Sequence, residues 1–220
     1  MPFVHKFVPR QSLKQITQES GVRHYEVTET GERFPSVTTI LSALDTKWLE
    51  DWKRRVGEEK ANEIGSIARR RGTAVHLLAE KYVMNDPEWA KGSMPFNLIE
   101  FKKLKKILDE HVDEIYGIEL PLFSRRLKTA GTTDQFCRYK GLKTVLDFKT
   151  STREKKEEKI ESYFIQTTAY ADMIEELYGE KIEKIVILMI VDHSEPLIFE
   201  KDRHEYMDKV NEIFVKNRPL

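Results

Sequence analysis

Apolar residues recur at helical spacing through the first half of the chain. In the clearest case, residues 58–84, apolar positions three and four apart define one face of a long amphipathic helix. Pro87 follows this segment and ends the pattern, because proline cannot continue a helix. Three more helices are predicted in this half: one beginning near Val37 with Ser36 as its N-cap, one at 47–56 and one at 97–112.

The second half of the chain changes to short runs rich in β-branched and apolar residues, which are typical of strands. Strands are predicted at residues 117–123, 132–139, 143–150, 184–191 and 196–199, with helices at 163–178, closed by Gly179, and at 203–216. Residues 153–161 are too charged to pack, so we expect a mobile connection or the exposed start of a helix there. Residues 1–34 show little pattern beyond a hairpin at 25–34. This order predicts an α+β fold with a mixed central sheet flanked by helices.

The length and composition suit one globular domain. Of the 220 residues, 40% are hydrophobic and 34% are charged, which favours a soluble globular protein over a disordered one. Within the single domain, residues 1–112 are expected to be mainly helical and residues 113–220 to form the core sheet with its helices. The one cysteine, Cys137, excludes an internal disulfide and a four-cysteine iron–sulfur cluster, and we expect it in the core.

Charge and hydropathy limit the partners and the compartment. The 37 basic and 37 acidic residues balance, so nucleic-acid binding would depend on a local basic surface such as Arg69, Arg70 and Arg71. No apolar run approaches the ~18 residues of a membrane span, and the first residues lack the apolar segment of a signal peptide. We therefore expect an intracellular, cytoplasmic protein with no membrane partner.

The segment Asp147-Phe148-Lys149 is the strongest candidate for chemistry. Side chains alternate along a strand, so Asp147 and Lys149 would project to one side and Phe148 to the other. An acid and a lysine on a largely buried strand are costly unless something uses them. Asp134 stands on the preceding predicted strand, and a divalent metal held by the two aspartates beside Lys149 would use all three. The alternative is a surface strand with a chance D-x-K sequence.

A second group of polar residues shares one face of the long helix. Arg69, Thr73, His76 and Glu80 are spaced by four, three and four positions, which places them together. A neutral imidazole is a competent metal ligand, so His76 could contribute to the same site. The alternative is that these residues are the solvated side of an amphipathic helix.

Gly131 to Asp134, Asp147 to Lys149 and Gln166 to Tyr170 follow one another along the chain. In this order they resemble the motifs of the RecB-type branch of the PD-(D/E)XK nucleases. The resemblance covers roughly residues 33–190. Within this range the chain is similar to phage-encoded exonucleases and to the mitochondrial genome-maintenance exonuclease. Thr133 stands where the family name has proline, and the middle acid is Asp147 rather than glutamate. The motifs that carry it are Gly131 to Asp134, Asp147 to Lys149, Gln166 to Tyr170, Pro35 to Leu41, Trp52, Arg71 to His76, and Glu80.

The resemblance implies a restriction-endonuclease-like core with a helical N-terminal elaboration, and a role for each matched residue. It implies Asp134, Asp147 and Lys149 as catalytic residues and Mg²⁺ or Mn²⁺ as the cofactor. Metal ligands would be His76, Asp134, Asp147 and the backbone carbonyl of Phe148, with Glu119 at a second metal or simply facing outward. Glu80 and Thr73 would support the metal ligands, and substrate would be bound by Gln166, Tyr170, Thr150, Ser151, Arg69, Arg70 and Arg71.

These expectations combine into a metal-dependent deoxyribonuclease, acting as an exonuclease on single-stranded DNA ends in replication, recombination or repair. The alternatives are a flap or junction endonuclease and a catalytically silent DNA-binding recombination module. The chain has no nucleotide-binding P-loop, so unwinding would require a partner, such as a helicase, and a single-strand-binding protein is a further candidate partner. A phage origin, with action in a bacterial host, fits the resemblance.

Overall fold

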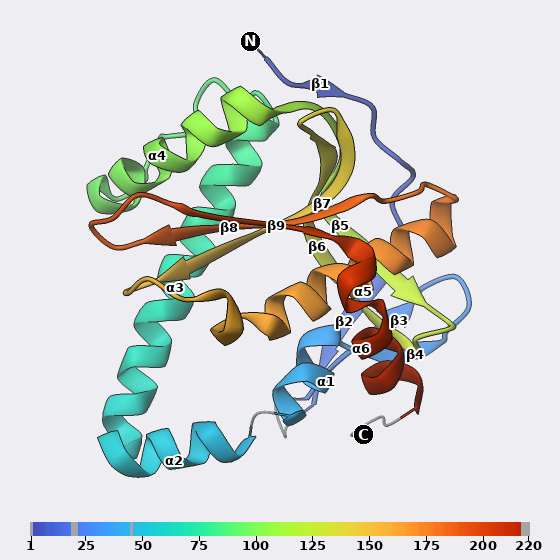
Figure 1. Cartoon of the computed structure of the whole chain (residues 1–220), viewed down its shortest axis with the longest axis horizontal. Helices are drawn as coiled ribbons and strands as arrows, with labels where there is room; N and C mark the ends of the chain where they lie inside the picture. Colours follow the sequence, from blue (N-terminus) through green and yellow to red (C-terminus); the bar gives the residue numbers. More distant parts are fainter. Residues whose placement is uncertain (1, 19–21, 45, 217–220) are drawn as a thin grey trace.

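A six-stranded mixed sheet forms the centre of the protein in the computed structural model, which describes residues 2–18, 22–44 and 46–216 (Figure 1). Its strand order is β1-β5-β6-β7-β8-β9. The β1–β5 and β7–β8 pairs are parallel and the other neighbours are antiparallel. This arrangement confirms the predicted α+β class. The strands are β1 Val4–His5, β5 Val112–Ser124, β6 Thr129–Tyr139, β7 Leu142–Ser151, β8 Lys184–Val191 and β9 Leu197–Asp202.

Helices cover both faces of this sheet (Figure 1). Helices α3 (Glu58–Val83) and α4 (Pro95–His111) pack on one face, and α5 (Glu161–Tyr178) packs on the other with α1 (Val37–Leu44) and α6 (Met207–Asn211). Helix α2 (Thr46–Val56) contacts the start of α3 and projects away from the sheet. The predicted helices are therefore present with small shifts of their ends, except for the region 203–216, which is not one continuous helix.

The helix caps follow the local sequence. Ser36 Oγ accepts a hydrogen bond from the backbone N–H of Thr39 at 3.0 Å, which is the N-cap predicted for α1. Gly179 ends α5 in the left-handed conformation, with φ of 68°, which a glycine adopts without steric cost. Asp202 and Glu205 form a reciprocal capping box at the start of the last helical region. That region, predicted as one helix, is a 3₁₀ turn (η2, Arg203–Tyr206), α6 and a π-helical turn (η3, Glu212–Lys216).

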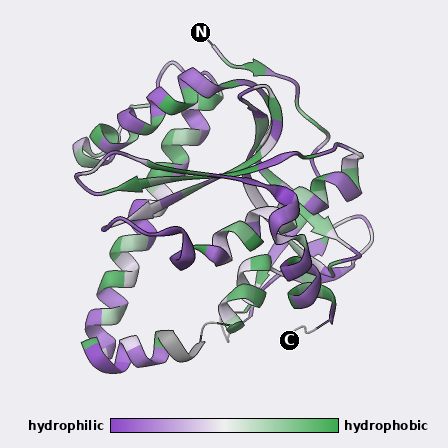
Figure 2. Cartoon of the chain, in the orientation of Figure 1, coloured by the Kyte–Doolittle hydropathy of each residue, from purple (hydrophilic) through white to green (hydrophobic). Residues whose placement is uncertain are grey.

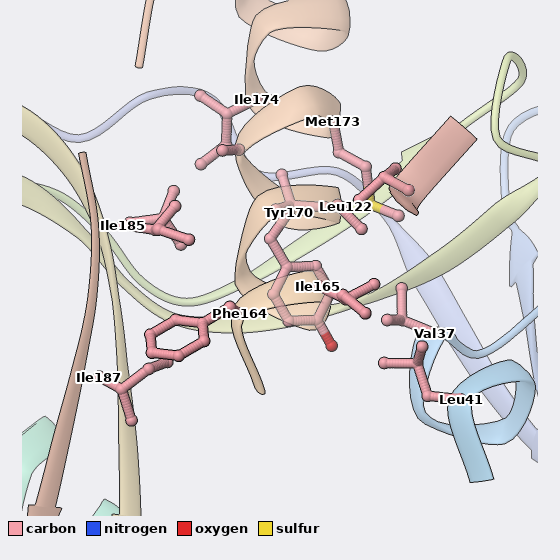
Figure 3. Packing of buried hydrophobic residues seen from close by; sticks show 14 of the residues in the cluster. Val37, Leu41, Leu122, Phe164, Ile165, Tyr170, Met173, Ile174, Ile185 and Ile187 are labelled. Carbon is pink, nitrogen blue, oxygen red and sulfur yellow. The ribbon is translucent and has the colours of Figure 1, made fainter. Parts of the chain in front are cut away.

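The hydrophobic core lies in two layers, one on each side of the sheet. Figure 3 shows α5 in the middle of one layer, with Ile185 and Ile187 of β8 on one side and Val37 and Leu41 of α1 on the other. The other layer joins α3 and α4 to the opposite face of the strands. Strand β8 is hydrophobic along its length because it is covered on both faces, whereas the described part of α2 is mostly hydrophilic (Figure 2).

A second, three-stranded sheet precedes the helices. It consists of β2 (Leu13–Thr17), β3 (Arg23–Val27) and β4 (Arg33–Pro35), all antiparallel, and it packs against Phe123 and Ala130. The β3–β4 pair confirms the predicted hairpin. Strands β1 and β2 are not in the sequence-based assignment, and strand β5 begins at Val112, five residues earlier than predicted.

The charged connection before α5 is only partly as predicted. None of the residues of its short 3₁₀ turn (η1, Glu157–Lys159) is buried. Ile160, at the end of the connection, is fully buried and packs in the core. Within the described residues, none of the helices has the length and apolar character needed to cross a membrane.

Candidate active site

Strands β6 and β7 part beside the predicted site, and Asp134 lies at the point of separation. Their last paired residues are Gln135 and Leu146. One position further on, Asp134 Oδ2 accepts a hydrogen bond from the backbone N–H of Phe148 at 2.6 Å. The side chain of Asp134 thus accepts the hydrogen bond that a backbone carbonyl would accept in a regular strand pair. Its other oxygen, Oδ1, faces a neighbouring group on α3.

That neighbouring group is His76. Its Nε2 lies 3.0 Å from the carbonyl oxygen of Phe148, and its Nδ1 lies 3.3 Å from Asp134 Oδ1 and 3.7 Å from Glu119 Oε1. A carbonyl oxygen can only accept, so Nε2 carries the hydrogen and donates it. In a neutral imidazole the Nδ1 lone pair would then face two carboxylates.

The arrangement around Nδ1 requires a positive charge. Burial by itself would lower the pKa of His76, but the hydrogen bonds to Asp134 and Glu119 and the charges of Asp134 and Asp147 outweigh it and raise the pKa to about 10. The donor atoms of His76, Glu119 and Asp134 all lie within 4.8 Å of one another. One imidazole nitrogen and two carboxylates in that space suit a divalent cation such as Mn²⁺ or Mg²⁺, which would replace the proton on Nδ1. The donor set therefore fits the predicted metal.

Glu119 reaches this group through an irregular backbone. Its φ is 42°, in the left-handed region that residues with a Cβ rarely adopt, and strand β5 has a register shift between Ile115 and Gly117. Arg10 holds the distortion, because its guanidinium donates to the carbonyl oxygens of Ile118 at 2.8 Å and Glu119 at 2.6 Å. Strained backbone of this kind concentrates at functional sites. No sequence pattern indicated Arg10, since it lies 108 and 109 positions before the two residues that accept its hydrogen bonds.

Asp147 and Lys149 form an ion pair next to the metal-ligand group. Asp147 is 1% exposed, and Lys149 Nζ lies 2.6 Å from its Oδ2. Burial raises the pKa of Asp147, and the adjacent ammonium of Lys149 opposes that shift. Phe148 packs in the α3–α4 layer while Lys149 faces α5, which is the alternation predicted for the strand. Asp147 is not among the three residues whose donor atoms converge, so its role as a metal ligand stays a prediction.

Helix α5 continues the polar chain from Lys149. Lys149 Nζ lies 3.5 Å from Gln166 Oε1, and Gln166 Nε2 lies 3.5 Å from the Tyr170 hydroxyl, so the predicted Q-x-x-x-Y residues do share one face and meet the D-x-K strand. Tyr170 is buried and its ring covers Gly131. A Cβ at position 131 would lie 2.8 Å from Cε1 and the hydroxyl oxygen of Tyr170. The glycine of one motif is therefore required by the tyrosine of the other.

We expect Gly131→Ala to lower the free energy of unfolding by about 1–3 kcal/mol, because the buried Tyr170 ring has to shift. Gly72→Ala in α3 is the matched control, since its Cβ would meet nothing closer than the Thr150 hydroxyl at 4.0 Å. That change should leave stability unaltered or raise it by up to about 1 kcal/mol, because alanine favours a helix. Urea titration of both variants measures the difference, and equal stabilities would contradict this packing.

The three consecutive arginines of α3 separate into two kinds. Arg69 and Arg70 are exposed, as a substrate contact requires. Arg71 is largely buried: its Nη2 lies 2.5 Å from Asp192 Oδ1, and its Nη1 donates to the carbonyl oxygen of Ser151 at 3.1 Å. Arg71 thus fastens α3 to the ends of β7 and β8, and its charge is already paired.

The remaining predicted residues lie around an open cavity above His76. Thr73 and Glu80 line it together with Gly72, His76, Leu77 and Glu119, and its volume is about 500 Å³. Thr150 lies under Gly72 at the edge of the same region. Ser151 does not line the cavity, and its hydroxyl donates to the carbonyl oxygen of Arg153 at 2.6 Å.

Metal binding to this group should depend on pH through His76. Below its raised pKa of about 10 the imidazole holds a proton that a cation has to displace, so Mn²⁺ affinity should rise about tenfold per pH unit between pH 7 and 9. Calorimetry in two buffers of different ionisation enthalpy counts the released proton. In His76→Gln the affinity should be weaker and vary less with pH. Equal wild-type affinities at pH 7 and 9 would contradict ligation through Nδ1.

Comparison with known proteins adds little to this picture. Neither a family model nor a curated protein matches the chain. Among solved structures it is similar to a protein from Eubacterium rectale described as a "putative exonuclease", with 14% identity over 64% of this chain and a TM-score of 0.43. It is also similar to SSO0001, with 14% identity, coverage of 66% of this chain and 76% of that one, and a TM-score of 0.29. The chain spans 63% of the length of the E. rectale protein.

Proposed function

We propose that the protein is a divalent-metal-dependent deoxyribonuclease of the RecB-type PD-(D/E)XK class. The observation that supports this most is the convergence of His76, Glu119 and Asp134 where β6 and β7 part, with the partly buried Lys149 ammonium on β7. A cluster of carboxylates favours a bound cation, and the Lys149 ammonium, which Asp147 pairs on one side, can face a second anion on its exposed side. A phosphodiester placed between a metal and a lysine satisfies both.

Each residue has a distinct task in this proposal. His76, Glu119 and Asp134 would hold Mg²⁺ or Mn²⁺, which when bound lowers the pKa of a coordinated water and polarises the phosphate. Lys149 would neutralise the charge that develops on the phosphate oxygens, while Asp147 keeps its ammonium in place across 2.6 Å. Gln166 would orient the lysine from the α5 side.

The substrate we propose is the end of a DNA single strand. The open cavity above His76 would receive the strand, and the exposed Arg69 and Arg70 on the same helix would contact its phosphates. Such contacts do not read bases, so binding should be independent of sequence and should weaken with salt. A single strand of this kind could be supplied by a helicase or a single-strand-binding protein.

Comparing DNA substrates tests this proposal. Linear single strands labelled at either end should be shortened in Mg²⁺ or Mn²⁺, circular single strands largely spared, and blunt duplex cut slowly. Rapid nicking of the circles would favour a flap or junction endonuclease. Strand binding with no cleavage in either metal would favour a catalytically silent DNA-binding module.

A further inference from the structure

A second cavity adjoins the candidate active site on the side of the N-terminal segment. It has a volume of about 320 Å³ and lies between residues 7–10, the end of α3 and the bulged part of β5. Most of its wall is aromatic or aliphatic, and its two acidic residues, Glu80 and Glu119, also line the cavity above His76. The two cavities therefore meet at these carboxylates. The remaining lining residues are Phe7, Val8, Arg10, Met84, Tyr116 and Leu120, with Gly117 and Ile118.

Two large apolar side chains stand exposed in this cavity. Phe7 is 50% exposed and Met84 is 46% exposed, although both face a concave, mostly apolar wall. The Phe7 ring is stacked on His5 on one side, with centroids 5.0 Å apart and an interplanar angle of 15°, so its orientation is set. A fixed aromatic ring with an accessible edge or face in a cavity is the usual partner of a flat, unsaturated ligand.

A positive charge accompanies the apolar wall. The guanidinium of Arg10 lies in this wall and donates to the backbone carbonyl oxygens of Ile118 and Glu119. The cavity therefore combines an aromatic ring, a thioether and a guanidinium with the carboxylates of Glu80 and Glu119, which lie at its boundary with the metal-ligand group. The ring and the thioether suit the base of a nucleotide, whose phosphate would then lie at the neighbouring metal-ligand group.

We propose that this cavity binds the base of the terminal nucleotide whose phosphate lies at the His76, Glu119 and Asp134 group. The proposal rests on the proposed nuclease function and assigns the base subsite of that reaction. Stacking on Phe7 and the apolar contact with Met84 would fix the end of the strand, and the released deoxynucleoside monophosphate would occupy the same place. Because stacking accepts any base, the subsite would hold an end in position without selecting sequence.

Binding of deoxyadenosine monophosphate in the presence of Mn²⁺, measured by calorimetry, tests the subsite. Loss of one aromatic stacking partner should weaken binding about 5- to 150-fold in Phe7→Ala, which corresponds to the usual energy of a base–aromatic stack. Phe7→Tyr keeps the ring and should bind as the wild type does. Val4→Ala is the matched control, because Val4 is 52% exposed on the same N-terminal segment and lies outside the cavity.

A ligand without a base separates stacking from phosphate binding. Deoxyribose 5-phosphate should bind equally to the wild type and to Phe7→Ala, and thermal unfolding should show that both are folded. Unchanged binding of the monophosphate by Phe7→Ala, or no binding by the wild type, would overturn the subsite. DNA cleavage assayed in parallel keeps the two ideas distinct. Cleavage with no Phe7 effect rejects the subsite alone, whereas Phe7-dependent binding without cleavage rejects the nuclease function alone.

Discussion

Asp134→Asn is expected to lower metal-dependent DNA cleavage by at least about a thousandfold, since a bound metal ion contributes several kcal/mol to the stabilisation of such a transition state. The asparagine can still accept the hydrogen bond from the Phe148 N–H, so the junction of β6 and β7 should persist. The charge that balances His76 and a bound cation is lost. The protein should therefore stay folded and lose its affinity for Mn²⁺.

Calorimetric titration with Mn²⁺ and cleavage of a labelled strand, both on the folded variant, measure this effect. Asp113→Asn is the matched control, because Asp113 is an exposed aspartate on β5 that pairs with Arg138 away from the site. It should bind metal and cut DNA as the wild type does. Full cleavage by Asp134→Asn would remove Asp134 from the catalytic site and leave it only the structural role of joining two strands.

Lys149→Met should show the second large effect, a loss of turnover of about a hundred- to a thousandfold with DNA and metal binding retained. The methionine keeps the apolar part of the side chain but removes the ammonium that would face the phosphate. Asp147, already raised in pKa by burial, can take up a proton when its partner is lost, so the fold should survive. Single-turnover cleavage at saturating DNA isolates the chemical step.

A matched lysine distinguishes this role from simple charge loss. Lys105→Met removes a lysine paired with Asp109 on α4, outside the candidate site, and should not change turnover. If Lys149→Met cut at the wild-type rate but bound DNA weakly, Lys149 would be a phosphate anchor and not a catalytic residue.

The sequence predicts the elements well where the signal is local. Residues 185–191 are all apolar and, with Lys184 before them, form β8 at the predicted bounds, and Ser36 and Gly179 mark helix ends through their own backbone requirements. The charge of Asp147 and Lys149 on a buried strand likewise identifies the site region, because burial of such groups is costly without a use.

What the sequence does not predict depends on contacts between distant residues. The two-residue strand β1 exists because it pairs with β5, and nothing in its own sequence marks it. Glu119 gives no sign of its left-handed backbone, which depends on Arg10, and Arg71 differs from its two neighbours only because Asp192 lies beside it. The Gly131–Tyr170 contact explains why two motifs occur together, yet only the folded chain reveals it.

Cleavage of a linear, end-labelled single strand by the purified wild type, with Mn²⁺ and then with excess chelator, tests the central proposal most directly. We predict hydrolysis in Mn²⁺, none in chelator, and full recovery when the metal is restored. His76→Ala in the same assay should need more Mn²⁺ for half-maximal cleavage, because one of the three converging donors is lost. Hydrolysis that persists in chelator, or no hydrolysis of any DNA in either Mn²⁺ or Mg²⁺, would contradict a metal-dependent nuclease.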